Sequence, residues 1–154
     1  MTSDTPTTEY PARPAWLAVL ARATLAQLEA KVPAAGELPS LKQVRAPEIG
    51  MVMLRGRVGG TGNPFNLGEA SVVRCAVRLG DGPLGVAYAL GRDKRRAELA
   101  ALFDALLQDP RHHDELQSVL IAPLALAQAQ ARARQQQDVA GSKVEFFTLV
   151  RGEA

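Results

Sequence analysis

The sequence predicts an α+β fold in which an antiparallel sheet of four to five strands has an N-terminal helix before it and a C-terminal group of helices preceding the last strand. Apolar residues recur with a period of two between residues 41 and 91, and with spacings of three and four on either side. The loops between the period-two runs are too short for crossover helices, so the strands must run antiparallel. The 154 residues have the size of one domain. We expect a disordered tail over residues 1–14 and a single domain over residues 15–154.

The period-two region contains four predicted strands, at residues 41–45, 51–58, 69–79 and 84–90. Gly80-Asp81-Gly82-Pro83 is typical of a hairpin turn, since Asp-Gly supplies the positive φ of a tight turn. The glycine-rich residues 59–64 predict a longer structural loop. They lack the ending of a nucleotide-binding loop and precede a strand instead of a helix. Residues 143–150 are strand-prone and would promote aggregation unpaired, so we expect them to complete the sheet.

Three helical regions flank these strands. One helix is predicted over residues 15–31 and ends at Pro33 and Gly36. A second runs to Gln108 with Asp93 as its N-cap, because its leucines recur at helical spacing. A third starts at residues 109–110 and is expected to be interrupted by Pro123, before an Ala/Gln/Arg run that we also assign as helix up to about residue 141.

Composition excludes several classes of protein. The net charge of +2 is too small to indicate nucleic-acid binding by itself. The single cysteine, Cys75, excludes an internal disulfide or an iron-sulfur cluster held by this chain alone, and is expected to be a small buried side chain. No apolar run could span a bilayer and no secretory leader is visible, so we expect a cytoplasmic protein.

No catalytic or metal-binding set is visible in the sequence. His112 and His113 are adjacent, so on a helix they point about 100° apart and cannot chelate one metal ion together. There is no Ser/His/Asp or Cys/His pattern and no convincing carboxylate pair. We therefore predict neither catalytic residues nor a metal site.

Two basic features are candidates for binding. Residues 42–96 contain ten Lys or Arg and four Asp or Glu, a difference of +6. Alternation places Arg55 with Arg57 on one strand face, and Arg74 with Arg78 on one face of the next strand. Such a surface can hold phosphate groups or an acidic partner. The alternative is the ordinary solvated face of an antiparallel sheet.

The second basic feature is the start of the helix capped by Asp93. Residues 92–96 place four cations, Arg92 and Lys94 among them, where the helix dipole is already positive. An incoming phosphate or acidic loop would account for them. Alternatively Asp93 caps the helix and solvent screens the cations.

Four blocks of the sequence carry a resemblance to a known family. They are Gly59-Gly60-Thr61-Gly62-x-Pro64-Phe65, Gly68-Glu69-Ala70 through Arg74-Cys75-Ala76-Val77-Arg78-Leu79, Leu90-Gly91-Arg92-Asp93-Lys94, and Phe146-Phe147-Thr148-Leu149-Val150-Arg151-Gly152. In order and spacing the sequence resembles the PhnG family, a component of the bacterial carbon-phosphorus lyase system of phosphonate catabolism. The resemblance runs from about Trp16 to the C-terminus and omits the first dozen residues and the Ala/Gln helix.

The resemblance implies a role within a complex. In that system the PhnG component and the H, I and J subunits form a core complex, with ATPase-like K and L subunits. The I subunit, aided by PhnG and by the H and L subunits, displaces adenine from ATP with a phosphonate, giving α-D-ribose 1-phosphonate 5-triphosphate. The J subunit later cleaves the carbon-phosphorus bond by iron-sulfur radical chemistry with S-adenosylmethionine. No catalytic residue is carried over to this chain, and ATP, the cluster and S-adenosylmethionine are implied for the complex.

The main functional prediction is therefore a non-catalytic, accessory subunit that binds no cofactor alone and contacts no nucleic acid or membrane. The predicted anion- or partner-binding residues, all basic, are Arg57, Arg74, Arg78, Arg92 and Lys94. The alternative is a stand-alone enzyme that binds ATP or phosphate at the basic sheet face. A single RNA-binding domain is a third hypothesis, weakened by the scarcity of strand aromatics.

Overall fold

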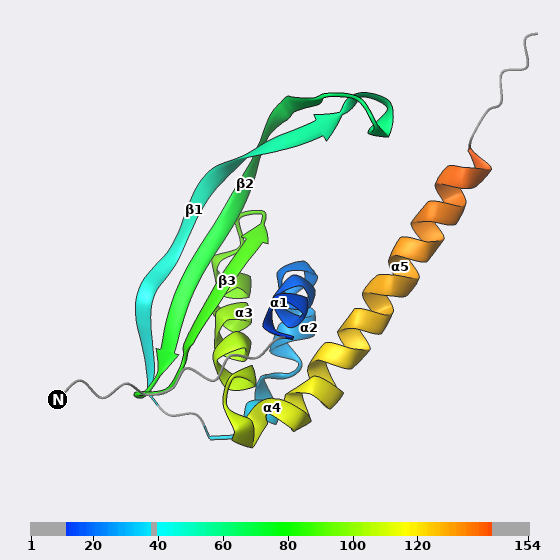
Figure 1. The fold of residues 1–154 in the computed structure, drawn as a ribbon. Helices are drawn as coiled ribbons and strands as arrows, with labels where there is room; N and C mark the ends of the chain where they lie inside the picture. Colours follow the sequence, from blue (N-terminus) through cyan, green and yellow to red (C-terminus); the bar gives the residue numbers. More distant parts are fainter. Residues whose placement is uncertain (1–11, 38–39, 143–154) are drawn as a thin grey trace, which may run out of the picture.

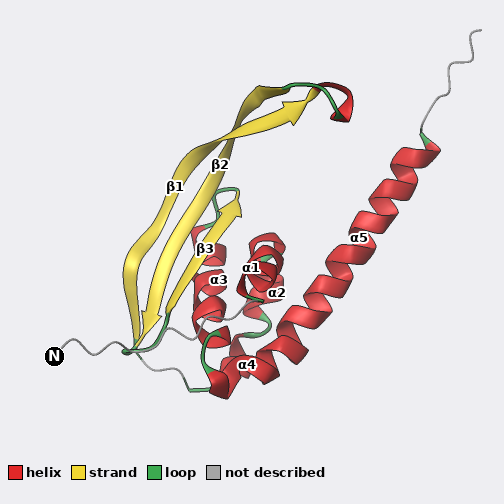
Figure 2. Ribbon diagram, in the orientation of Figure 1, coloured by secondary structure: helices red, strands yellow, loops and turns green. Residues whose placement is uncertain are grey.

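The computed structural model describes residues 12–37 and 40–142, and these residues form an α+β fold. The sheet contains β1 (Leu41–Arg57), β2 (Pro64–Leu79) and β3 (Leu84–Leu90), all antiparallel in the order β1-β2-β3. Helices pack on one face of the sheet, while the β1–β2 hairpin extends beyond the end of β3 (Figures 1 and 2). Most of the predicted tail at residues 1–14 lies outside the described residues. The predicted strand at residues 143–150 lies entirely outside them.

The predicted count of four to five strands is not confirmed, because the described residues form three strands. The predicted strands at residues 41–45 and 51–58 belong to one long strand, β1. Residues 46–50 stay extended, and register shifts between Gln43 and Arg45 and between Arg45 and Glu48 absorb the irregular sequence there. Pro47 does not end the strand because β1 is an edge strand, where a missing N–H is tolerated.

The two loops of the sheet form as tight, glycine-dependent turns. In the β2–β3 turn, Gly80 has φ of 53°, and the Gly82 N–H donates to the Leu79 carbonyl at 2.8 Å. In the β1–β2 loop, a short 3₁₀ turn (Val58–Gly60) contains Gly59 at φ 60°. Both regions were predicted as turns or loops, and the structure confirms them. The positive φ of the β2–β3 turn, however, comes from Gly80 and not from the predicted Asp81-Gly82 pair.

The N-terminal helix is broken where the sequence predicts continuity. Instead of one helix over residues 15–31, the structure has α1 (Arg13–Arg22) and α2 (Leu25–Glu29), followed by a 3₁₀ turn (Val32–Ala35). Thr24 starts α2 through a capping box, in which its side chain accepts from the Gln27 N–H and the Gln27 side chain accepts from the Thr24 N–H. A Thr-x-x-Gln cap inside an apolar helical pattern therefore starts a new helix.

The central helix α3 (Lys94–Leu107) forms as predicted and supplies more of the core than any other element of the described residues. The Asp93 side chain caps it, accepting from the Arg96 N–H at 2.9 Å. The helix packs on the sheet face that carries the buried side chains of Val73, Cys75 and Val77. No helix of residues 12–37 or 40–142 covers the opposite face of the sheet (Figure 2).

The C-terminal helices are joined without a break. After α4 (Pro110–Leu116), a π-helical turn (Gln117–Ile121) leads directly into α5 (Ala122–Gly141). Pro123 does not interrupt the helical segment, contrary to the prediction. It lies in the first turn of α5, and the wider π turn precedes it. The Ala/Gln/Arg run is helical, as predicted. Most of α5 is exposed and projects from the body (Figure 1).

Candidate anion- or partner-binding surface

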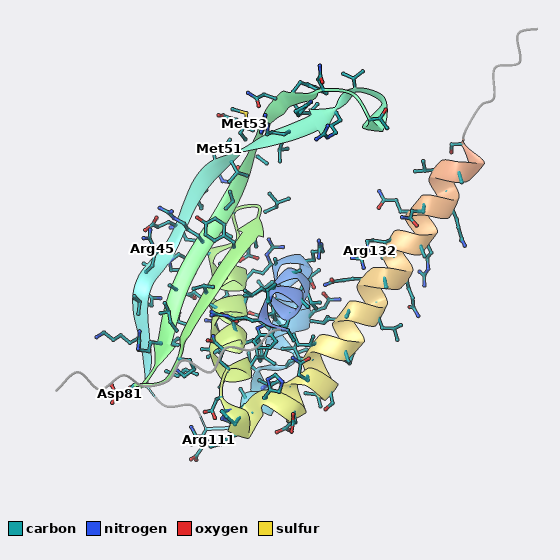
Figure 3. All side chains as sticks on the ribbon, in the orientation of Figure 1. Arg45, Met51, Met53, Asp81, Arg111 and Arg132 are labelled. Atoms are coloured by element: carbon teal, nitrogen blue, oxygen red, sulfur yellow. The ribbon has the colours of Figure 1, made fainter. Side chains whose placement is uncertain are left out.

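The uncovered face of the sheet gathers basic side chains from β1 and β2. In β2, Arg74 and Arg78 alternate with the buried Val73, Cys75 and Val77, so both arginines point away from α3. Lys42 is the Cα partner of Arg78 across the β1–β2 ladder, and Arg45 is the partner of Ala76. Figure 3 shows Arg45 on the side of β1 remote from the helices. We call Lys42, Arg45, Arg74 and Arg78 the basic face.

Arg74 is held by one carboxylate. Its Nε and Nη2 donate to Glu48 Oε2 at 3.0 and 2.9 Å, and its Nη1 donates to the Tyr88 hydroxyl at 3.5 Å. The hydrogen bond from Arg74 lowers the pKa of Glu48, and those to Tyr88 and Glu48 raise the pKa of Arg74. Arg45 reaches the same carboxylate at 3.3 Å. Glu48 therefore serves two guanidinium groups, and both arginines remain largely exposed.

Arg78 lies at the other end of the basic face. Its Nη1 donates to the Gly82 carbonyl at 3.4 Å, a bond that satisfies a donor without neutralising the charge. Lys42 lies directly across the ladder, and like charges in that position repel each other. With four cations and the single carboxylate of Glu48, the basic face has an excess of three positive charges that an anion or an acidic surface would offset.

The predicted cation cluster at the start of α3 divides into two kinds of residue. Arg95 pairs with Glu98 at 3.4 Å, and the Arg96 side chain donates to the Leu90 carbonyl. Arg92 and Lys94 are exposed, and no side-chain hydrogen bond joins either of them to another described residue. These two are the members of the cluster still available to an external anion.

Arg57 lies far from the other predicted residues. It ends β1 beside the loop, where its Nη1 donates to the Gly62 carbonyl at 3.2 Å. Its ladder partner is Pro64, whereas Lys42 and Arg78 pair at the opposite end of β1. The structure thus distributes the five predicted residues over three places: Arg74 and Arg78 share the basic face, Arg92 and Lys94 share the start of α3, and Arg57 lies apart at the hairpin loop.

Lys42, Arg45 and Glu48 were not singled out from the sequence as members of this face. The two register shifts near Arg45 break the alternation of β1, so a strict period of two cannot assign those side chains to a face. The signal that could have found them is the local excess of cations beside a lone glutamate.

Other potentially reactive groups lie elsewhere. Cys75 is buried under α3, and burial raises the pKa of its thiol to about 11. Among residues 12–37 and 40–142, no group of three or more His, Cys, Asp or Glu side chains is placed to hold a metal ion. The His113 ring lies in an edge-to-face contact with Trp16, with centroids 5.5 Å apart. His113 therefore has a packing role.

The fold and surface define a small α+β protein whose charged groups are displayed on an open sheet face. Its sequence matches the model of the family described as phosphonate metabolism protein PhnG over residues 11–152, and the chain belongs to this family. It is 46% identical over 135 residues to the alpha-D-ribose 1-methylphosphonate 5-triphosphate synthase subunit PhnG of Rhizobium meliloti (strain 1021). That match covers 88% of this chain and 86% of the relative. Among the described residues, no helix is both long and apolar enough to cross a membrane.

Proposed function

We propose that this chain is an accessory subunit of a synthase that makes α-D-ribose 1-phosphonate 5-triphosphate from ATP and a phosphonate. The observation that carries the proposal is the 46% identity, over most of both chains, to a protein named as a subunit of such a synthase. The proposed partners are the H, I and J subunits of the carbon-phosphorus lyase system, with its ATPase-like K and L subunits, in the cytoplasm.

The chemistry is proposed to belong to the partners. ATP, the iron-sulfur cluster and S-adenosylmethionine would be bound elsewhere in the complex. The cysteine count supports this division, because the chain has one cysteine, Cys75, whereas an iron-sulfur cluster is held by several cysteine thiolates. This chain would contribute surface charge and binding contacts.

Within that role, we assign the basic face and the pair of Arg92 and Lys94 to contacts with an acidic partner surface or a phosphate group. The supporting observations are the juxtaposition of Lys42 with Arg78 and the exposure of Arg74. Arg57 remains a predicted residue for contact with a partner or an anion. Its side chain also donates a hydrogen bond to the Gly62 carbonyl within the β1–β2 loop.

The test is reconstitution with the co-expressed partner subunits. Omitting this chain should abolish formation of the ribose triphosphate product from ATP and methylphosphonate. The double variant Arg74→Ala/Arg78→Ala should lose at least about tenfold in product formation or in complex affinity, since it removes the charge-assisted contacts of both guanidinium groups.

The matched control is Arg22→Ala/Arg111→Ala, which removes two cations outside the basic face and should leave both measurements unchanged. Full product formation in the absence of this chain would contradict the accessory role. Stoichiometric binding of ATP by the purified chain alone, lost in the Arg74/Arg78 variant, would favour the stand-alone ATP-binding enzyme instead.

A further inference from the structure

The free edge of β3 is closed by side chains. The Val86 N–H, which points away from β2, donates to Asp104 Oδ2 at 2.9 Å. Two carbonyls on the same edge, those of Leu84 and Leu90, accept from side chains of α1, α3 and the residue that ends α3. These bonds run from Arg13 Nη2 and Gln108 Nε2 to Leu84, at 3.1 and 2.9 Å, and from Arg96 to Leu90. An added strand would have to displace these groups, so β3 is a protected edge.

The other edge of the sheet, β1, has two different halves. Its first half carries the two register shifts and Pro47, features that obstruct pairing with another strand. Residues 49–57 are continuously extended, and the irregularity opposite Leu54 and Arg55 arises from an extra residue in β2, Leu67. We call residues 49–57 the distal edge.

The distal edge directs unpaired backbone groups outward. The Gly91 N–H donates to the Ser71 carbonyl at 2.8 Å, so Ser71 turns its backbone groups toward the β3 side. Its ladder partner Met51 must then point its own N–H and C=O away from β2. By alternation Met53 does the same. Among the described residues, no hydrogen bond reaches these outward backbone groups.

Apolar side chains flank the distal edge and are exposed. Beyond the ladder row of Gly50, Val72 and Leu90 the sheet is a two-stranded ribbon. There Met51, Met53 and Leu67 have 58%, 53% and 65% of their surface exposed. Figure 3 shows both methionines on the part of the hairpin that extends past β3 and α3. A two-stranded ribbon is marginal in water, and a third strand would cover these side chains.

The charge of the distal edge favours a foreign strand. It contains Arg55 and Arg57 and no acidic residue, so a second copy of the same edge would bring four cations to one seam. The chain's own residues 143–151 contain Lys143 and Arg151 against Glu145 alone. An acidic group on a different polypeptide complements the edge better than either of these.

We propose that residues 49–57 accept an extended strand from another subunit of the synthase, apolar at alternate positions and acidic where it passes Arg55 and Arg57. This inference rests on the proposed function, because it takes the partner to be a synthase subunit. Backbone hydrogen bonds would supply much of the affinity, and the exposed methionines would adapt to the incoming side chains. The hairpin would thereby act as a docking arm.

Hydrogen exchange on the complex tests the proposal directly. The amides of Met51 and Met53 should exchange rapidly in the isolated chain and at least about tenfold more slowly in the complex with the co-purified subunits. Unchanged exchange in an intact complex would overturn strand addition and leave the proposed function standing. Failure of the wild-type chain to form any complex would contradict the proposed function itself.

Variants separate the backbone contribution from that of the side chain. Met53→Pro removes an outward N–H and leaves the ladder with β2 intact, so the dissociation constant of the complex should rise at least about tenfold. Met53→Val keeps the donor and should bind normally. Arg55→Glu should also weaken the complex, and it serves as the second variant if the proline chain folds poorly. Normal affinity in both Met53→Pro and Arg55→Glu would contradict the proposal.

The other possible occupants give distinct results. Protection of Met51 and Met53 in the isolated chain that rises with its concentration would identify a second copy as the occupant. Protection at all concentrations that is lost when residues 143–154 are deleted would identify the chain's own C-terminal segment. Either result would overturn the assignment to a partner strand.

Discussion

The buried carboxylate of Asp104 on α3 accepts a hydrogen bond of 2.8 Å from the indole nitrogen of Trp16 on α1, 88 residues earlier in the chain. The same carboxylate pairs with Arg13 at 2.8 Å and accepts from the Val86 N–H. Asp104 thus joins the first helix, the central helix and the edge of β3. Buried polar groups of this kind stabilise a fold only while every partner is satisfied.

We expect Asp104→Ala to lower the free energy of unfolding by about 3 kcal/mol, because it leaves buried donors without acceptors. Urea denaturation monitored by circular dichroism would measure the change. Asp104→Asn is the matched control, since it keeps an acceptor oxygen of the same shape, and its loss should be smaller. A loss below about 1 kcal/mol for the alanine variant would show that Asp104 is not a structural centre.

Gly85 marks the closest approach of α3 to the sheet. A Cβ atom built at this residue would overlap the Ala101 carbonyl oxygen and lie 2.8 Å from the Ala105 Cβ. Gly85→Ala should therefore destabilise the protein by about 3 kcal/mol or prevent folding, because helix backbone cannot move aside cheaply. Gly50→Ala is the matched control within the same sheet, since no atom lies within 4 Å of its added Cβ. Equal unfolding midpoints for the two variants would contradict this packing.

Cys75 should react slowly with thiol reagents in the folded protein. Its pKa of about 11 leaves only about 0.1% thiolate at pH 8, so alkylation should be at least about a hundredfold slower than for a free cysteine. Iodoacetamide labelling followed by mass spectrometry would measure the rate, and labelling in urea is the control. Rapid labelling of the native chain would show that the thiol is accessible.

The raised pKa of the Cys75 thiol also predicts how the free energy of unfolding changes with pH in the alkaline range. The unfolded chain loses the thiol proton near its ordinary pKa of 9, whereas the folded chain keeps it up to about pH 11. The unfolded state therefore binds fewer protons in this interval, and the Cys75 contribution to stability falls as the pH rises. A Cys75→Ala variant should lack this component in urea titrations between pH 9 and 11. Parallel pH profiles for the two proteins would contradict it.

The sequence predicts helices more reliably than strand boundaries in this chain, for physical reasons. The helix α3 combines the Asp93 cap with leucines at helical spacing, so local and tertiary preferences agree. The break before α2 was missed because the apolar spacing continues across Thr24, and only the capping box signals a new start. In β1, Pro47 indicates an interruption, yet the position of β1 at the sheet edge makes the proline harmless.

The candidate site was predictable in part. Alternation placed Arg74 and Arg78 on one face correctly, since β2 is regular there. Their neighbours Lys42, Arg45 and Glu48 depend on the register of β1 with β2 and on two bulges, which period-two reasoning does not contain. The side chains that close the β3 edge come from α1 and α3, so they emerge only from the packed structure.

The exposed ion pair of Arg74 with Glu48 should compete with any anion that reaches the basic face. Glu48→Gln removes the carboxylate that occupies Arg74 and Arg45, so the affinity of the purified chain for inorganic triphosphate should rise about two- to fivefold at low salt. Because Arg74 holds the pKa of Glu48 below its ordinary value of 4.5, the wild-type carboxylate is ionised at neutral pH and the ion pair is lost only in acid. Glu69→Gln is the matched control, since Glu69 is the ladder partner of Met53 in the two-stranded part of the hairpin. Isothermal titration calorimetry of both variants would measure the effect. Equal affinities for the wild-type and Glu48→Gln chains would show that an acidic protein surface, and not a phosphate group, is the ligand to seek for the basic face.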